Sequence, residues 1–241
     1  MPTYEEEYNS LIESTKQYLM QQADLFGNII YTEEQKQAAP QGLKFSSVYP
    51  DEAWTRSASL DEQNGQICNC LKCGLGQTRT NFVFGVGNPN ADVMFIGEAP
   101  GADEDAQGIP FVGRAGQLLT KIIEAVQMKR DDVYICNILK CRPPNNRDPE
   151  PAEMETCTPY LYKQIEIIKP KFIICLGRIS AQWILKTNSS LGGMRGKVHD
   201  FHGIKLIVTY HPAALLRNPN WKYDTWEDMK MFKRLYDEMK A

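Results

Sequence analysis

The chain of 241 residues contains no apolar run close to the roughly 18 residues that a membrane-spanning helix needs. It also lacks a secretory signal, because its first seven residues carry three glutamates and no basic residue. With 42% apolar and 24% charged residues, its composition excludes a collagen-like, wholly disordered or disulfide-dense protein. We therefore expect a globular, cytoplasmic protein of one domain, with room for an extension.

An overall positive charge is missing as well, because 27 Lys and Arg residues stand against 30 Asp and Glu residues, a net charge of −3. Taken alone, that balance argues against nucleic acid as a partner. The charge is unevenly distributed, however. Residues 1–64 contain 11 acidic and 4 basic residues, whereas residues 65–241 contain 19 acidic and 23 basic residues. The larger part is therefore mildly positive, with a net charge of +4.

This charge difference separates two parts of the chain. We interpret residues 1–64 as an N-terminal extension, made of an amphipathic helix over 4–26 and a linker or loosely ordered strap over 27–64. Residues 65–241 form the functional domain.

Four short apolar runs recur in the second part, and each is rich in β-branched or aromatic residues. They lie at 93–96, 133–136, 172–176 and 206–209. Runs without alternation predict strands that are buried on both faces. Helical patterns lie between them, at 118–126, 157–168 and 179–184. The alternation predicts an α/β fold, a three-layer αβα sandwich around a four-stranded parallel sheet, with the helical extension at its N-terminus.

In such sheets, ligands bind at the carboxyl ends of the strands. Three motifs follow the predicted strands there: Gly97-Glu-Ala-Pro-Gly101 with Pro110-Phe-Val-Gly113, then Asn137 with Lys140-Cys-Arg-Pro-Pro144, and His211-Pro-Ala-Ala-Leu-Leu-Arg217. None is a P-loop or a dinucleotide-binding fingerprint. Phe111 could belong to the core or stack on a planar ligand. Asn137 could cap a turn or read an amide-like edge, because its side chain both donates and accepts.

Seven cysteines are spread over the chain. Cys136 and Cys175 lie inside apolar runs and are interpreted as buried core residues. Four others could meet in the fold as metal ligands: Cys70, Cys73, Cys141 and Cys157. Four thiolates suit either Zn²⁺ or an iron–sulfur cluster, and spacing alone does not choose between them. Cys68 competes with Cys70 as a ligand.

Together, these motifs and cysteines resemble the iron–sulfur uracil-DNA glycosylases called family 4, over about residues 68–220. The resemblance implies an enzyme that flips uracil out of single- or double-stranded DNA and hydrolyses the N-glycosidic bond, leaving an abasic site. It also implies a [4Fe–4S] cluster, with Cys70, Cys73, Cys141 and Cys157 as its ligands.

Carried onto the matching positions, the resemblance implies that Phe111 stacks on the flipped base. Asn137 would read the polar edge of uracil and exclude cytosine, and His211 would stabilise the negative charge that develops on uracil O2. Glu98 and Ala99 would line the base pocket.

The same resemblance implies contacts to DNA beyond the base. Leu215 would enter the space that the flipped base vacates. Arg142, Arg147 and Arg217 would contact phosphates, which orients a protein on DNA without reading its sequence.

The first motif departs from that of the cluster-free uracil glycosylases in two places. Ala99 stands where those enzymes carry the Asp that orients water, so we expect Glu104 to position the water or the cationic sugar, with Asp105 as the second candidate. Gly101 stands where they carry a Tyr that blocks thymine, so thymine must be excluded by another group. No His lies in the segment 138–156, where a related group binds the sugar covalently, and we expect hydrolysis without covalent capture.

Other functions stay open beside this one. The chain could be a DNA-damage binding module with weak or no catalysis, or a glycosylase for a broader set of deaminated bases or for mismatched thymine. A cluster-containing redox protein is a more remote interpretation. We expect a monomer whose partners are uracil-containing DNA and downstream repair proteins, with no membrane contact and with association to the nucleoid while it scans DNA.

Overall fold

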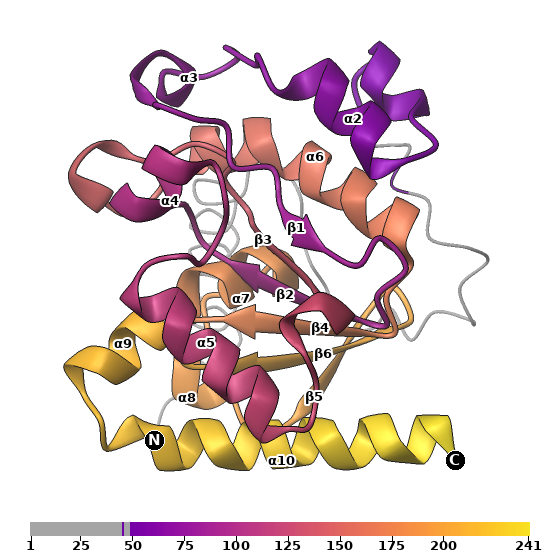
Figure 1. Ribbon diagram of the computed structural model, residues 1–241, viewed down its shortest axis with the longest axis vertical. Helices are drawn as coiled ribbons and strands as arrows, with labels where there is room; N and C mark the ends of the chain where they lie inside the picture. Colours follow the sequence, from indigo (N-terminus) through magenta and orange to yellow (C-terminus); the bar gives the residue numbers. More distant parts are fainter. Residues whose placement is uncertain (1–44, 46–48) are drawn as a thin grey trace, which may run out of the picture. The chain divides into compact units, whose positions relative to one another are not determined.

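A six-stranded sheet runs through the part of the chain that the computed structural model describes, Phe45 and residues 49–241 (Figure 1). Its strand order is β1-β3-β2-β4-β6-β5. The four central strands are parallel: β3 (Tyr134–Asn137), β2 (Val93–Gly97), β4 (Phe172–Leu176) and β6 (Ile204–Thr209). These are the four predicted strands, so the parallel sheet is confirmed.

Two short strands that the sequence did not predict extend the sheet at its edges. Strand β1 (Val86–Gly87) pairs with β3, and β5 (Val198–Phe201) pairs with β6, both antiparallel. These strands are largely exposed, as Val86 and Val198 show, so no apolar run in the sequence indicated them.

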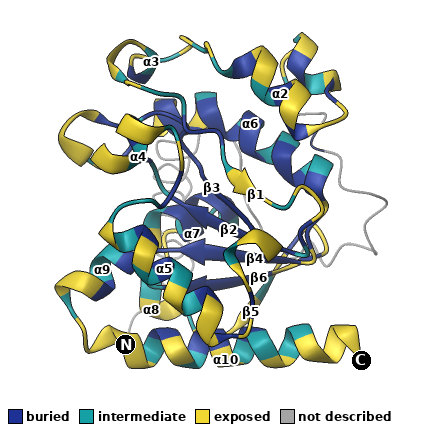
Figure 2. Ribbon diagram, in the orientation of Figure 1, coloured by how far each residue is buried: buried dark blue, intermediate teal, exposed yellow. Residues whose placement is uncertain are grey.

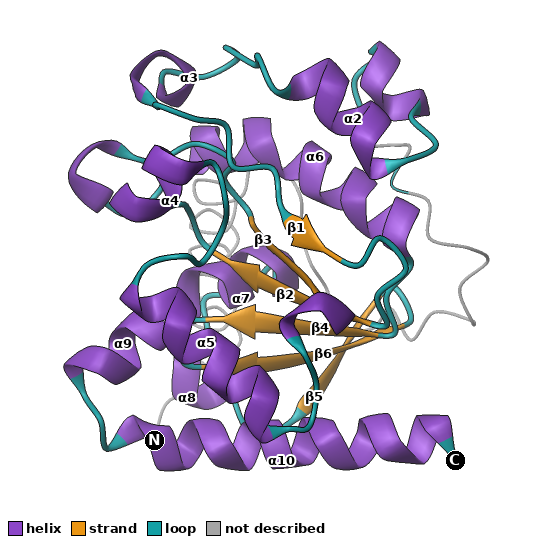
Figure 3. Ribbon diagram, viewed as in Figure 1, coloured by secondary structure: helices purple, strands orange, loops and turns teal. Residues whose placement is uncertain are grey.

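Helices surround the sheet (Figure 3). The longer ones are α2 (Leu60–Ile67), α5 (Arg114–Ala125), α6 (Pro151–Ile168), α7 (Arg178–Leu185) and α10 (Trp221–Lys240). Shorter turns of helix are η2 (Ala53–Arg56), α3 (Leu75–Thr78), α4 (Ala102–Gln107), η3 (Arg130–Asp132), η4 (Pro144–Asn146), α8 (Leu191–Met194) and α9 (Pro212–Arg217). The three predicted helices are confirmed as α5, α6 and α7. No helix within the described ranges is both long and apolar enough to cross a membrane.

Alternate residues of each central strand pack against different helices. In β2, Met94 and Ile96 belong to a hydrophobic cluster with residues of α6 and α7, whereas Val93 and Phe95 belong to a second cluster with residues of α5 and α10. Both faces of the sheet are therefore buried (Figure 2). This double burial is the physical reason for the unbroken apolar runs, and it confirms the predicted three layers.

The described end of the expected linker or strap, residues 49–64, packs onto this domain and includes the start of α2. Trp54 is buried and meets Tyr160 of α6 edge to face, with ring centroids 4.7 Å apart. Ser59 caps α2 by accepting from the backbone N–H of Glu62, and Gln63 Nε2 donates to the carbonyl of Tyr160 over 2.9 Å.

The rest of the expected extension, including the helix over 4–26, lies outside the described residues. The division of the chain into residues 1–64 and 65–241 stays a prediction.

Candidate functional site

The loops that follow the four parallel strands surround a pocket of about 790 Å³. Parallel pairing sets Gly97 opposite Asn137 at the carboxyl ends of β2 and β3, and Leu176 opposite Thr209 at those of β4 and β6. Most of the predicted site residues line this pocket: Glu98, Ala99, Glu104, Phe111, Asn137, Arg147, His211 and Arg217. The sheet therefore brings the three loop motifs together, as expected from strand order.

Asn137 is the polar side chain at the base of the pocket. It is only 1% exposed, and its Oδ1 has no hydrogen-bond partner among the described residues. A side chain on Gly97 would collide with this oxygen, so the glycine at the end of β2 is required for it to lie there. A buried polar atom without a partner is costly. Asn137 is therefore arranged to receive a hydrogen bond from a ligand.

Phe111 forms a wall of the same pocket. Its backbone has a φ of 54°, which is unusual for a residue other than glycine, and Arg130 Nη2 donates to its carbonyl over 3.1 Å. The Phe111 ring lies 5.5 Å from the ring of His211, centroid to centroid, at an angle of 34°. It belongs to a hydrophobic cluster of the core and also lines the pocket, so its stacking on a planar ligand stays a prediction.

His211 caps helix α9, and this contact defines its tautomer. The backbone N–H of Ala213 donates to His211 Nδ1 over 3.2 Å, so Nδ1 carries no proton. Burial, assisted by the positive charge of Arg217, lowers the pKa of His211 to about 4. At neutral pH the ring is therefore uncharged, and Nε2 carries its one N–H.

The Glu104 carboxylate binds the main chain of its own loop. Oε2 accepts from the N–H of Gly101 over 3.1 Å, and Oε1 accepts from those of Val112 and Gly113 over 2.9 and 3.1 Å. These three bonds join the start of the loop to its end. Glu104 lines the pocket, but both of its carboxylate oxygens are already hydrogen-bonded to the backbone of the loop.

Asp105, the second candidate for handling water, is wrong as a site residue. It is 5% exposed, it does not line the pocket, and its Oδ1 accepts from the backbone N–H groups of Thr80 and Asn81. Its carboxylate holds the segment that precedes β1 in place.

The Glu98 side chain lines the pocket and has no hydrogen bond to the described residues. Burial, with a smaller contribution from the negative charge of Asp148, raises the pKa of Glu98 to about 7 against the opposing positive charge of Arg178. Asp148 and Arg178 also line the pocket and lie 3.8 Å apart. Sequence reasoning missed both. Arg178 follows the predicted end of β4, which was a usable signal, whereas nothing in the sequence marked Asp148.

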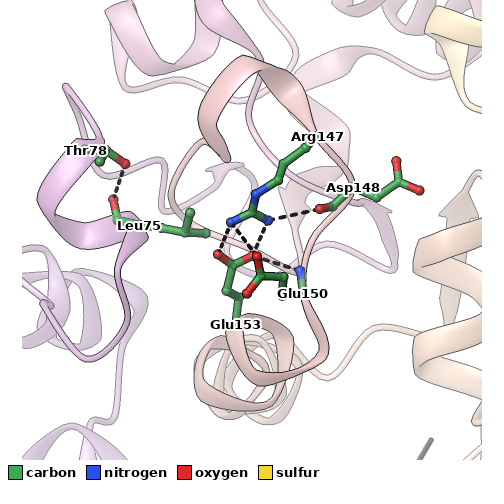
Figure 4. A network of polar contacts seen from close by, with 6 residues as sticks. All are labelled: Leu75, Thr78, Arg147, Asp148, Glu150 and Glu153. Carbon is green, nitrogen blue, oxygen red and sulfur yellow. Dashed lines mark hydrogen bonds and ion pairs between the residues drawn. The ribbon is translucent and has the colours of Figure 1, made fainter.

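Arg147 is bound by carboxylates of helix α6, which corrects its expected availability for phosphate. Nη1 donates to Glu153 Oε2 over 2.9 Å and Nη2 to Glu153 Oε1 over 2.6 Å, a two-pronged contact to a side chain that is largely buried (Figure 4). Glu150 adds a third contact at 3.2 Å. The guanidinium therefore fixes the loop between β3 and α6 to the start of that helix.

Two other expected DNA contacts lie apart from the pocket. Arg142 does not line it and donates to Asn146 Oδ1 over 2.8 Å. Leu215 is 1% exposed in this structure, and its expected entry into DNA stays a prediction. Its neighbour Leu216 is 40% exposed. Arg217, by contrast, is exposed and at the pocket.

The four cysteines that were expected as ligands are neighbours. Cys141 and Cys157 are buried, and Cys70 and Cys73 pack against the same hydrophobic cluster. Burial raises the pKa of the Cys157 thiol to about 12, with smaller contributions from the charges of Cys141 and Cys70. The Cys68 thiol donates to the carbonyl of Gly65 over 3.8 Å, and its competition with Cys70 as a ligand stays open.

Three donors point at sulfur atoms of this cysteine site, which consists of Cys70, Cys73, Cys141 and Cys157. The Tyr160 hydroxyl donates to Cys70 Sγ and Arg79 Nη1 to Cys141 Sγ, both over 3.2 Å, and the backbone N–H of Lys140 donates to Cys157 Sγ over 3.3 Å. Arg79 also binds the carbonyls of Cys68 and Cys70. In the described part of the chain, no group of three or more His, Cys, Asp and Glu side chains is arranged so that it could hold a metal ion.

Comparison with known proteins adds a family to this geometry. A family model described as the uracil DNA glycosylase superfamily matches residues 84–239. The chain is 49% identical over 186 residues to the type-4 uracil-DNA glycosylase of Sulfurisphaera tokodaii, covering 73% of this chain and 84% of that protein. It is 46% identical over 185 residues to the enzyme of the same name from Archaeoglobus fulgidus, covering 73% and 93%. The type-4 enzyme of Thermotoga maritima is 44% identical over 167 residues, covering 68% and 87%.

Proposed function

Because this chain belongs to the uracil DNA glycosylase superfamily, we infer that it is a DNA-repair enzyme that excises uracil from DNA. It hydrolyses the N-glycosidic bond between the base and deoxyribose and leaves an abasic site. The observation that carries this function is the buried Asn137 oxygen without a partner, beside Phe111 and His211, at the carboxyl ends of the parallel strands.

Recognition of the base rests on Asn137 and Phe111. A uracil flipped out of the stack lies against the Phe111 ring, in a pocket large enough for one base. Uracil offers an N–H donor and a carbonyl acceptor side by side, which match the oxygen and the NH₂ group of an asparagine side chain. Cytosine reverses that pattern and would leave Asn137 Oδ1 unpaired and buried, which excludes it.

His211 stabilises the departing base. As the bond to the sugar breaks, negative charge develops on the uracil, and the Nε2–H of a neutral imidazole donates to O2. The Ala213 N–H fixes the tautomer that this task requires, because it leaves Nδ1 without a proton. A donor held in place before the reaction is typically a large catalytic contribution.

We propose that Glu98, in place of Glu104, accepts the proton of the attacking water. Ala99 has no acceptor, and the two oxygens of Glu104 hold three backbone N–H groups. The Glu98 side chain lines the pocket without such bonds to the described residues. Its raised pKa suits a group that accepts a proton near neutral pH.

Contacts to DNA come from the rim of the pocket. Arg217 and Arg178 are exposed there and are placed for phosphates, and Leu216 is the apolar side chain free to enter the vacated space. A DNA substrate would associate the protein with the nucleoid in the cytoplasm.

The cysteine site is proposed to hold a [4Fe–4S] cluster through Cys70, Cys73, Cys141 and Cys157. Four cysteines, with hydrogen-bond donors on the sulfur atoms of three of them, suit such a group, because thiolates that ligate a cluster accept hydrogen bonds. When bound, it would cross-link the loop at 68–73 to the segment that follows β3 and to α6.

A broader substrate range is the second candidate, and Gly101 favours it. This pocket residue has no side chain to meet the methyl group of thymine. Hypoxanthine and mismatched thymine are therefore included among the test substrates.

Uracil excision is tested under single-turnover conditions on single-stranded and duplex oligonucleotides. We expect the purified protein to release uracil, and His211→Ala to react roughly 10²–10³ times more slowly, because one preorganised donor is lost. DNA affinity, measured in parallel, should stay near that of the wild type. Absence of excision from uracil and from the other bases would identify a binding module in place of an enzyme.

The Glu98 assignment predicts a pH dependence. Because the folded-state pKa of Glu98 is raised to about 7, the carboxylate form is lost as pH falls through 7, and the single-turnover rate should fall with it. The pKa of His211, near 4, leaves that ring neutral throughout this range. Glu98→Gln should flatten the profile. Asp148→Asn should move its midpoint to lower pH and Arg178→Ala to higher pH. A Glu98→Gln profile that matches the wild type would remove Glu98 from this task.

The two adjacent leucines are a matched pair. Leu215→Ala should lower the free energy of unfolding by about 2–5 kcal/mol, since it removes a buried side chain. Leu216→Ala should leave stability within about 0.5 kcal/mol and slow excision from duplex more than from single-stranded DNA. Urea unfolding and single-turnover assays separate these effects. If Leu216→Ala slowed excision from duplex and from single-stranded DNA by the same factor, the proposed entry of Leu216 into duplex DNA would be contradicted.

A further inference from the structure

Lys140 is a fully buried lysine that stands between the pocket and the cysteine site. Its side chain is 0% exposed, and Nζ donates to the backbone carbonyl of Asn137 over 2.8 Å and to Gln164 Oε1 over 2.7 Å. Lysine is rarely buried so completely unless it is paired. Both of these acceptors are uncharged, so neither balances the ammonium.

The backbone of Lys140 contacts the cysteine site directly. Lys140 immediately precedes Cys141 in the chain, and its own N–H donates to Cys157 Sγ over 3.3 Å. A metal group held by cysteine thiolates would place negative charge beside this buried side chain, and a buried cation is favourable only when it is paired.

On the other side, Lys140 contacts the strand end that forms the pocket. The carbonyl that it binds belongs to Asn137, whose side chain reads the base. Residues 138 and 139 donate their N–H groups to the carbonyls of Gly97 and Glu98, over 3.1 and 3.0 Å. A shift of Lys140 would thus be transmitted to Asn137 and Glu98, two of the polar residues of the pocket.

The far end of the contact is firmly anchored. Gln164, on helix α6, donates through Nε2 to the carbonyl of Phe84 and to the hydroxyl of Tyr134, over 3.0 and 3.2 Å. Lys140 is therefore held between α6 and β3 and has little freedom to rotate away.

We propose that Lys140 is a positioning residue that couples occupancy of the cysteine site to the position of Asn137, and so to the binding of uracil. The proposal rests on the proposed function. Coupling of this kind is reciprocal: if the group held by the cysteines favours the uracil-binding position of Asn137, uracil must favour retention of that group.

The test measures loss of iron from the purified, iron-loaded protein to a chelator, with and without saturating free uracil. We expect uracil to slow iron loss by about fivefold or more in the wild type. Lys140→Met, which keeps the length of the side chain but cannot donate, should lose iron at the same rate with and without uracil. Lys72→Met is the control, because Lys72 is a surface lysine of the cysteine loop, and it should retain the slowing.

A second variant guards against failure of Lys140→Met to fold or to hold iron. Gln164→Met removes the anchor on α6 and should reduce the slowing, while the contact to Asn137 remains possible. If uracil slowed iron loss equally in the wild type and in whichever of the two variants still holds iron, the proposal would be overturned. A wild type that excises uracil but shows no slowing would overturn it as well. A wild type without excision would instead refute the proposed function.

Discussion

The site depends on the parallel register of four strands. Backbone pairing places Gly97 beside Asn137, and the N–H of Gly177 on the carbonyl of Thr209, so loops far apart in sequence begin at one edge of the sheet. Helices on both faces bury the strands completely and leave this edge as the place where polar side chains can converge. Every residue that we assign to base recognition or catalysis lies at one of these strand ends or in the loop that follows it.

Hydrogen-bond partners divide the polar residues of this edge into two kinds. Glu104 and Arg147 form hydrogen bonds within the protein itself, Glu104 to its own loop and Arg147 to Glu153. Asn137 Oδ1 and the Glu98 carboxylate have no such partners among the described residues. The polar groups that are hydrogen-bonded within the protein thus stabilise the fold. We assign base recognition and catalysis to the polar groups without partners, which a ligand or water would hydrogen-bond.

Much of this could be predicted from the sequence, because burial on both faces and the order of strands leave a local pattern. The central strands and the pocket at their carboxyl ends follow from it, whereas the roles of Asn137 and His211 were inferred from the resemblance of the loop motifs to a known family. Contacts through space leave no such trace. Nothing in the sequence indicated that Arg147 would bind Glu153. Nor did it indicate which of Leu215 and Leu216 would face the core, because the two residues are identical and adjacent, yet one is buried and the other exposed.

The central claim is that a buried asparagine at a strand end reads the flipped base, and the single-turnover rate of Asn137→Ala tests it most directly. On a uracil-containing single strand, the account predicts a large loss of rate with DNA affinity retained, because the variant removes the polar edge that holds the base but none of the phosphate contacts. A rate equal to that of the wild type would contradict the account and would place base recognition elsewhere.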